Sequence, residues 1–279
     1  MSAPTTILFT FRPIPTLVTM CEGRDIDVVG LLRQHGIPEE AATGQVTAPL
    51  AKLQAFLDDI ALRLHAPLLG LDLADRIPRG SYGLIEFVVR AAPSVRHGLS
   101  ALCELSPLLN PLNDLRYIAD ERGCEVHFAY GGLRDALGPQ LNEYTIAFIA
   151  KAFASVLGTS LPLERAWFAH SRPDHAAEVA ARLACNVGFQ GADSGFAVTS
   201  DVIEHRIASA DPQLFEFLLT QARTQLENVG GVNVVAMTVR AIEARLNGGR
   251  CQCGRDRGID GDDRTQPAAS PCGREHHVS

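Results

Sequence analysis

Residues 122–132, RGCEVHFAYGG, mark the point at which the periodicity of this chain changes. Before this stretch apolar residues recur every three or four positions, and within it they recur at every second position. Such alternation predicts a half-buried strand, which the glycines at positions 123 and 131 bound. The alternating residues are Cys124, Val126, Phe128 and Tyr130 on one side and Glu125, His127 and Ala129 on the other.

The part of the chain before this strand has the pattern of helices. Residues 49–67, PLAKLQAFLDDIALRLHAP, place one apolar face at helical spacing between two prolines. Residues 25–38 predict a shorter helix. Residues 80–112 predict two helices that separate at Pro93, because proline disfavours helical backbone at the residue before it. The apolar face of the first helix consists of Leu53, Phe56, Leu57, Ile60 and Leu64.

After the strand, helices and strands alternate. We expect helices at 142–158, 173–188, 211–228 and 233–249, a strand at 165–171, and a strand that runs into a turn at 194–203. Asp211 followed by proline is a strong signal for the start of a helix. These strands are too few and too scattered for a doubly wound parallel sheet. The sequence therefore predicts an α+β fold, in which an N-terminal helical bundle precedes a small, largely antiparallel sheet with packed helices.

Composition excludes several classes of protein. The chain has 279 residues, of which 46% are hydrophobic and 20% charged, as in ordinary globular proteins. Its net charge of −7 provides no basic field for nucleic acid. The first residues make a poor signal peptide, and no stretch approaches the roughly 18 apolar residues of a membrane span. Seven cysteines, mostly isolated, are typical of a reducing compartment. We expect a cytoplasmic protein without a membrane partner.

The sequence contains no recognisable catalytic or metal-binding motif. Patterns for a serine nucleophile, a zinc protease, a phosphate loop and Cys-x-x-Cys are absent. The adjacent carboxylates Asp58 and Asp59 point to different sides of a helix. The C-terminal tail holds possible zinc ligands, but its spacing and its spacer do not fit a structural zinc site. We therefore expect no enzyme, no cofactor and no metal. The tail residues concerned are Cys251, Cys253, Cys272, His276 and His277.

Two stretches resemble a known family. Residues 74–112, ADRIPRGSYGLIEFVVRAAPSVRHGLSALCELSPLLNPL, and residues 166–218, from AWFAHS to LFEFL, are similar to the N-terminal effector domain of AraC/XylS-type transcription regulators of the arabinose-binding-like subgroup. The similarity extends over residues 10–247 as many weak positions in the right order. It implies a bacterial regulator that senses a small molecule and reads DNA with helix-turn-helix units. Residues 232–249 resemble the opening helix of that DNA-binding domain.

The tail from residue 250 departs from the family. Read one base later, it accommodates M-T-x-R-S-L-Q-R-R-L-A-x-E-S-T-T-Y from Asp262, which is close to the recognition-helix motif of the family. From Gly249 it accommodates D-V-S-V-A-A-I-A, the preceding helix. We interpret the tail as a frame-shifted helix-turn-helix, through a mutation or a sequencing error. It is rich in glycine and proline with almost nothing to bury, so we expect it to be disordered and to retain no DNA-binding residue.

The resemblance implies three parts. These are an effector-binding domain at 10–209, a linker helix with the first helix of a truncated helix-turn-helix domain at 210–249, and the disordered tail at 250–279. The expected function is that of a one-component regulator, a homodimer that binds a small-molecule effector, with DNA as a partner only in a full-length, in-frame version. The alternative is a stand-alone protein for small-molecule binding or dimerisation without DNA binding.

Two sets of residues are candidates for these roles. Tyr130, Trp167 and His170 lie on two predicted strands, and we expect them to line the effector pocket; the alternative is that such aromatic residues belong to the core. Leu218 and Leu226 are apolar positions on a helix that otherwise has the pattern of a surface. We expect them to form a dimer contact, and the alternative is that they pack on their own domain.

Overall fold

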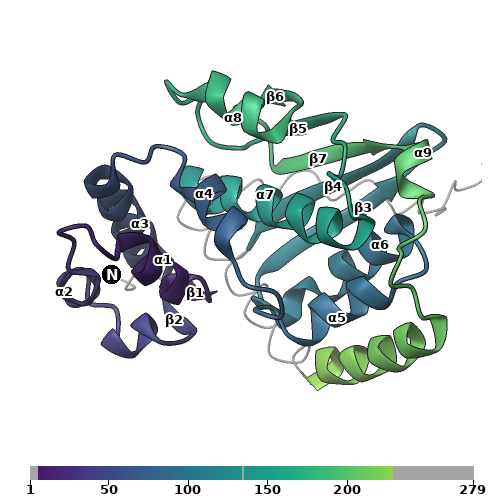
Figure 1. Ribbon diagram of the computed structural model, residues 1–279, viewed down its shortest axis with the longest axis horizontal. Helices are drawn as coiled ribbons and strands as arrows, with labels where there is room; N and C mark the ends of the chain where they lie inside the picture. The colour runs from purple at the N-terminus through teal and green to yellow at the C-terminus, as the bar shows by residue number, and fades with distance from the viewer. Residues whose placement is uncertain (1–5, 134, 229–279) are drawn as a thin grey trace, which may run out of the picture. The chain divides into compact units, whose positions relative to one another are not determined.

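The computed structural model of this chain describes residues 6–133 and 135–228. The first part packs helices and a two-stranded sheet around one hydrophobic core (Figure 1). Its elements are β1 (Leu8–Phe11), α1 (Ile14–Cys21), α2 (Val28–Gln34), the 3₁₀ turn η1 (Glu39–Ala42), β2 (Val46–Pro49), α3 (Leu50–Leu64) and α4 (Leu69–Arg76).

Capping residues define the helices of this part. The Asp27 side chain accepts a hydrogen bond from the Gly30 amide at 2.8 Å, which satisfies a free N–H group in the first turn of α2. Helix α3 begins directly after Pro49 and ends at Leu64, and the next residue, His65, has a left-handed backbone with φ of 50°. The helices predicted within residues 25–38 and 49–67 are therefore confirmed as α2 and α3.

The strands β1 and β2 were not among the sequence expectations. They pair antiparallel, with Phe9 opposite Ala48 and Phe11 opposite Val46. Each strand has four residues, which is too short for a period of two to stand out from the neighbouring apolar residues. The N-terminal part is therefore helical with one small strand pair.

The second part is built on a five-stranded sheet of order β3-β4-β7-β5-β6. All neighbouring strands are antiparallel except β5 and β6, so the predicted α+β fold with a largely antiparallel sheet is confirmed. The elements are α5 (Leu84–Ala91), α6 (Val95–Leu105), η2 (Ser106–Leu108), β3 (Asn113–Ala119), β4 (Gly123–Tyr130), α7 (Gly138–Leu157), β5 (Arg165–Trp167), α8 (Ala176–Leu183), β6 (Asn186–Gly188), β7 (Ser194–Thr199) and α9 (Ser200–Ile203).

Helix α7 belongs to both hydrophobic cores. Leu141 and Tyr144 in its first half are buried in the N-terminal core. Ile149 and Phe153 in its second half are buried in the core beneath the sheet. Gly158, with φ of 72°, ends the helix as the sequence predicts. Because α7 serves both cores, it fixes the N-terminal helices against the sheet.

Three details of the sheet differ from expectation. Strand β3, at the edge, was missed. Strand β5 is shorter than the expected 165–171, and β6 falls within the expected helix 173–188. Helix α8 stops early because Ala184 adopts a left-handed backbone with φ of 53°. Alanine rarely takes this conformation, so the sequence carries no signal for the end of the helix.

Residues 212–228 form the predicted helix after Asp211. The Asp211 carboxylate accepts hydrogen bonds from the amides of Gln213 and Leu214 at 3.1 and 3.0 Å. An ion pair between Arg223 and Glu104 at 2.6 Å joins this helix to α6. The expected helix 233–249 and the tail 250–279 lie outside the described residues, and the domain boundaries remain predictions.

None of the helices in residues 6–133 and 135–228 has the length and apolar character that crossing a bilayer requires.

Candidate functional site

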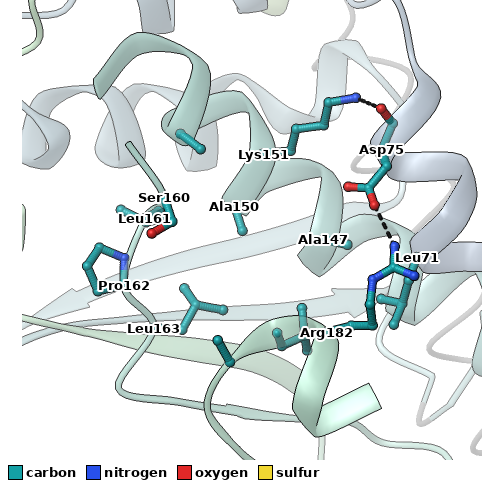
Figure 2. Close-up of a pocket in the computed structure, with 13 residues that line it drawn as sticks. Leu71, Asp75, Ala147, Ala150, Lys151, Ser160, Leu161, Pro162, Leu163 and Arg182 are labelled. Atoms are coloured by element: carbon teal, nitrogen blue, oxygen red, sulfur yellow. Dashed lines mark hydrogen bonds and ion pairs between the residues drawn. The ribbon is translucent and has the colours of Figure 1, made fainter. Parts of the chain in front are cut away.

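A cleft of about 410 Å³ lies between α4, α7, residues 160–163 and the end of α8 (Figure 2). Sites for small molecules are usually concave, largely apolar and of this size or larger. The residues that line the cleft are Leu71, Asp75, Ala147, Ala150, Lys151, Ala154, Ser160, Leu161, Pro162, Leu163, Arg182, Leu183 and Ala184.

Small side chains on one face of α7 leave room for this cleft. Ala147, Ala150 and Ala154 recur at helical spacing, so their methyl groups lie on the same side of the helix. Leucines at positions 161 and 163 belong to the same lining. An alanine face opposite leucines gives a mainly apolar site without filling it.

The charged side of the cleft is formed where α4 meets α7 and α8. The Lys151 ammonium donates to the carbonyl oxygens of Ala74, at 3.0 Å, and Asp75. These carbonyls belong to the last turn of α4, where the helix leaves them without a partner. Arg182 pairs with Asp72 at 2.8 Å and with Asp75 at 2.5 Å. The hydrogen bond with Asp72 is the main reason why the pKa of Arg182 is raised.

The three residues expected at the effector pocket lie in different surroundings, and none of them lines this cleft. Tyr130 is buried in the N-terminal core, and its hydroxyl donates to the Leu8 carbonyl at 2.7 Å. It also borders a small hollow of about 10 Å³ next to Asp193. The assignment of Tyr130, Trp167 and His170 to effector binding stays a prediction.

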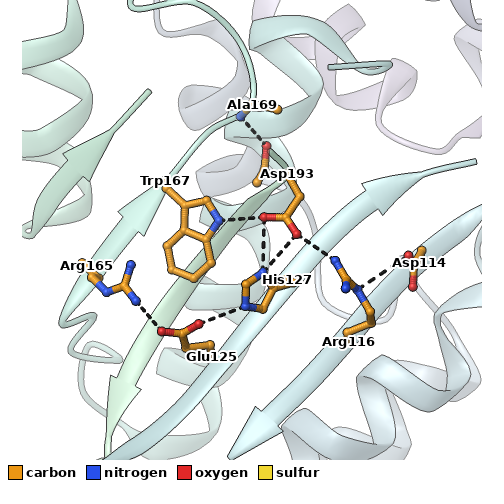
Figure 3. Close-up of polar contacts among 9 residues, drawn as sticks. Asp114, Arg116, Glu125, His127, Arg165, Trp167, Ala169 and Asp193 are labelled. Atoms are coloured by element: carbon orange, nitrogen blue, oxygen red, sulfur yellow. Dashed lines mark hydrogen bonds and ion pairs between the residues drawn. The ribbon is translucent and has the colours of Figure 1, made fainter. Parts of the chain in front are cut away.

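Trp167 lies on the sheet within a polar network (Figure 3). Its indole N–H donates to Asp193 at 3.0 Å, and the Arg165 guanidinium lies 4.7 Å from the centre of its ring. A side chain on Gly195, its neighbour in β7, would overlap the indole ring, so glycine is required there. The network therefore holds Trp167 against the sheet.

Two carboxylates organise this network from either side of His127. Asp193 contacts Nδ1 of His127 at 3.0 Å and accepts from Arg116 at 2.8 Å. Glu125 contacts Nε2 of His127 at 2.9 Å and pairs with Arg165. Every charged group here has a partner of opposite sign, so the arrangement is that of a structural cross-strand cluster.

His170 is buried beside a carboxylate that has no hydrogen-bond partner among the described residues. The His170 side chain is 1% exposed, and its Nδ1 contacts the Ser171 carbonyl at 2.9 Å. Its Nε2 lies 3.6 Å from Oε1 of Glu143, which is 0% exposed. Burial raises the pKa of Glu143 to about 7 and lowers the pKa of His170. Burial therefore favours the neutral form of both side chains. Glu143 could not be predicted from the sequence, because a single glutamate in a helix gives no signal of burial.

Stability should fall as the pH rises from about 4.5 to about 7, because the Glu143 carboxyl stays protonated in the folded chain while it ionises in the unfolded chain. The loss should reach roughly 3 kcal/mol above pH 7. His170 acts in the opposite direction and only below its ordinary pKa of 6.5. Replacing Glu143 with glutamine should remove the loss, as urea unfolding of both proteins across this range would reveal.

The matched control for this prediction is Glu121→Gln, which changes an exposed carboxylate and should keep the pH dependence of the natural chain. A Glu143→Gln protein with the same pH dependence as the natural chain would contradict the assignment of this effect to Glu143.

The leucines expected at a dimer contact are partly buried. Leu218 and Leu226 pack against the core beneath the sheet. On the outer side of the same helix, Leu214 is 45% exposed and Phe217 is 61% exposed. The dimer assignment stays a prediction, and the apolar side chains that the described residues leave uncovered on this helix are Leu214 and Phe217.

Comparisons with known proteins agree with this fold. A family model described as the arabinose-binding domain of AraC transcription regulators, N-terminal, matches residues 26–207. The crystal structure of the transcriptional regulator CdpR from Pseudomonas aeruginosa matches with a TM-score of 0.52 and 17% identity, over 80% of this chain and 72% of that chain. At this identity the match shows a shared fold. No curated protein matches the chain. Because the family model spans well over half of the chain, this protein belongs to the AraC-type transcription regulators that carry the arabinose-binding N-terminal domain.

Proposed function

We propose that this protein is a one-component regulator whose N-terminal domain senses a small molecule in the cleft between α4, α7 and α8. The observation that carries the proposal is the cleft itself, about 410 Å³ in volume, apolar along Ala147, Ala150 and Ala154, and charged at one side. Such a combination of apolar walls and a few polar groups is typical of small-molecule sites.

We further propose how the protein acts and which partners it has. The protein acts by binding and carries no catalytic activity. It functions in the cytoplasm as a homodimer through helix 212–228, on which Leu214 and Phe217 are exposed. It reads DNA only in a version whose frame is intact after Gly249, because residues 250–279 lack the pattern of a recognition helix.

Filling the cleft tests the sensing function. The side chain of Ala150 points into the cleft (Figure 2), so Ala150→Phe should occupy the space that a ligand needs. Small apolar and mixed molecules would be screened by thermal unfolding of the full chain. A ligand at a hundred times its Kd should raise the Tm of the natural chain by about 5–10 °C, and should leave the Tm of Ala150→Phe unchanged.

Ala177→Phe is the matched control, since Ala177 is exposed on α8 and does not line the cleft. This variant should respond to the same ligands as the natural chain. Ligands that stabilise Ala150→Phe as strongly as the natural chain would place the sensing site elsewhere.

A further inference from the structure

The two cations of the cleft differ in their partners. Arg182 is neutralised by Asp72 and Asp75, each of which forms an ion pair with it. Lys151 forms no ion pair with any carboxylate of the described residues, and its ammonium is held by the carbonyls of Ala74 and Asp75 alone. Carbonyl dipoles stabilise a cation but do not neutralise its charge.

Lys151 is partly buried, and this burial lowers the pKa of its ammonium group. The negative charge of Asp75 raises the pKa of Lys151, and the positive charge of Arg76 lowers it. An ammonium group has three N–H donors, and the two carbonyls of α4 use two of them. One N–H donor of the Lys151 ammonium is therefore left to the cleft, and among the described residues no carboxylate lies within ion-pair distance of this ammonium.

We infer that the ligand of the cleft is an organic monoanion, an apolar body with a single carboxylate that pairs with Lys151. This inference rests on the proposed function and adds the class of ligand. The apolar body lies along the alanine face of α7, opposite Leu161 and Leu163. A dianion finds no second free cation in the lining, because Arg182 is already paired. A zwitterion finds no free carboxylate there, because Asp75 pairs with Arg182.

The alternative role of Lys151 is only to cap the end of α4. The chain offers a control for this role, because it has just two lysines. The second one, Lys52, donates to the Gly36 carbonyl at 3.2 Å just beyond the end of α2, and it does not line the cleft. A variant that removes only the charge separates the two roles. Lys151→Gln keeps an N–H donor for the carbonyls of α4, and Lys151→Arg keeps the charge.

The experiment compares three probes of the same length, octanoate, octanol and octylammonium, by calorimetric titration of the full chain. Octanoate should bind at least about tenfold more tightly than octanol, because a hydrogen bond to a charged group contributes more than a neutral one, and octylammonium should bind least. Lys151→Gln should weaken the binding of octanoate by about ten- to a hundredfold and leave that of octanol unchanged, which also verifies the fold. Lys151→Arg should restore most of the affinity, and Lys52→Gln should have no effect.

Two results would overturn the inference in different ways. If octanol binds as tightly as octanoate, or if Lys151→Gln binds octanoate like the natural chain, the anionic head group is refuted while the cleft remains a ligand site. If none of the three probes binds saturably, or if Ala150→Phe binds all of them unchanged, the inference fails together with the sensing function proposed for the cleft.

Discussion

A version of this protein whose reading frame is shifted by one base after Gly249 should bind its operator at least about a thousandfold more tightly than the chain as it stands. Specific binding requires side chains on a packed recognition helix in the major groove, and each good base contact contributes about 1–3 kcal/mol. Residues 250–279 have no such pattern, and the net charge of −7 offers little attraction to phosphate.

A mobility shift on the upstream region of the gene, with both proteins at equal concentration and physiological salt, would measure this difference. Resequencing of the codons for residues 247–261 shows which version the organism carries. Sequence-specific binding by the present chain would contradict the frame-shift interpretation.

Replacing Gly70 with valine should destabilise the protein by about 4 kcal/mol or prevent its folding, since overpacking against backbone cannot relax. Gly70 lies in α4 where this helix crosses α7. A Cβ atom there would overlap the carbonyl oxygen of Gln140 and lie 3.1 Å from the amide nitrogen of Tyr144. Both are backbone atoms, so the two helices would have to separate, and one wall of the cleft would move with them.

Urea unfolding and ligand titration would measure both effects. Gly44→Ala is the control, because a Cβ atom at Gly44 meets nothing within 4 Å. We expect this variant to keep its stability. A Gly70→Val protein as stable as the natural chain would mean that α4 does not need its close approach to α7.

The sequence predicts those parts of the fold whose local chemistry determines them. Strand β4 follows from its alternation, α3 from the face between its prolines, and the helix after Asp211 from its cap. The short strands β1, β2 and β6 could not be predicted, because three or four residues carry no measurable period and long-range pairing forms them. The end of α8 at Ala184 has no sequence signal either.

The candidate site was harder to predict than the fold. The aromatic pattern of the sequence favours Tyr130, Trp167 and His170, whereas alanines and leucines make up much of the cleft lining. The alanines at 147, 150 and 154 are visible in the sequence, but small residues on a helix more often indicate close packing than an open cleft. The role of Lys151 depends on its contact with the last carbonyl groups of α4. The crossing of α4 and α7 at Gly70 brings these groups together, and the sequence does not reveal this crossing.

The order of the strands has a consequence for the synthesis of the protein. Strands β3 and β4 are adjacent in the chain and pair as soon as both have been made, whereas β4 pairs on its other edge with β7, after α7, β5, α8 and β6. Closing so long a loop costs entropy before any contact compensates for it, which slows folding. On the ribosome, the backbone N–H and C=O groups along this edge of β4 therefore stay unpaired until Thr199 has emerged. This is the interval in which a nascent chain depends most on chaperones.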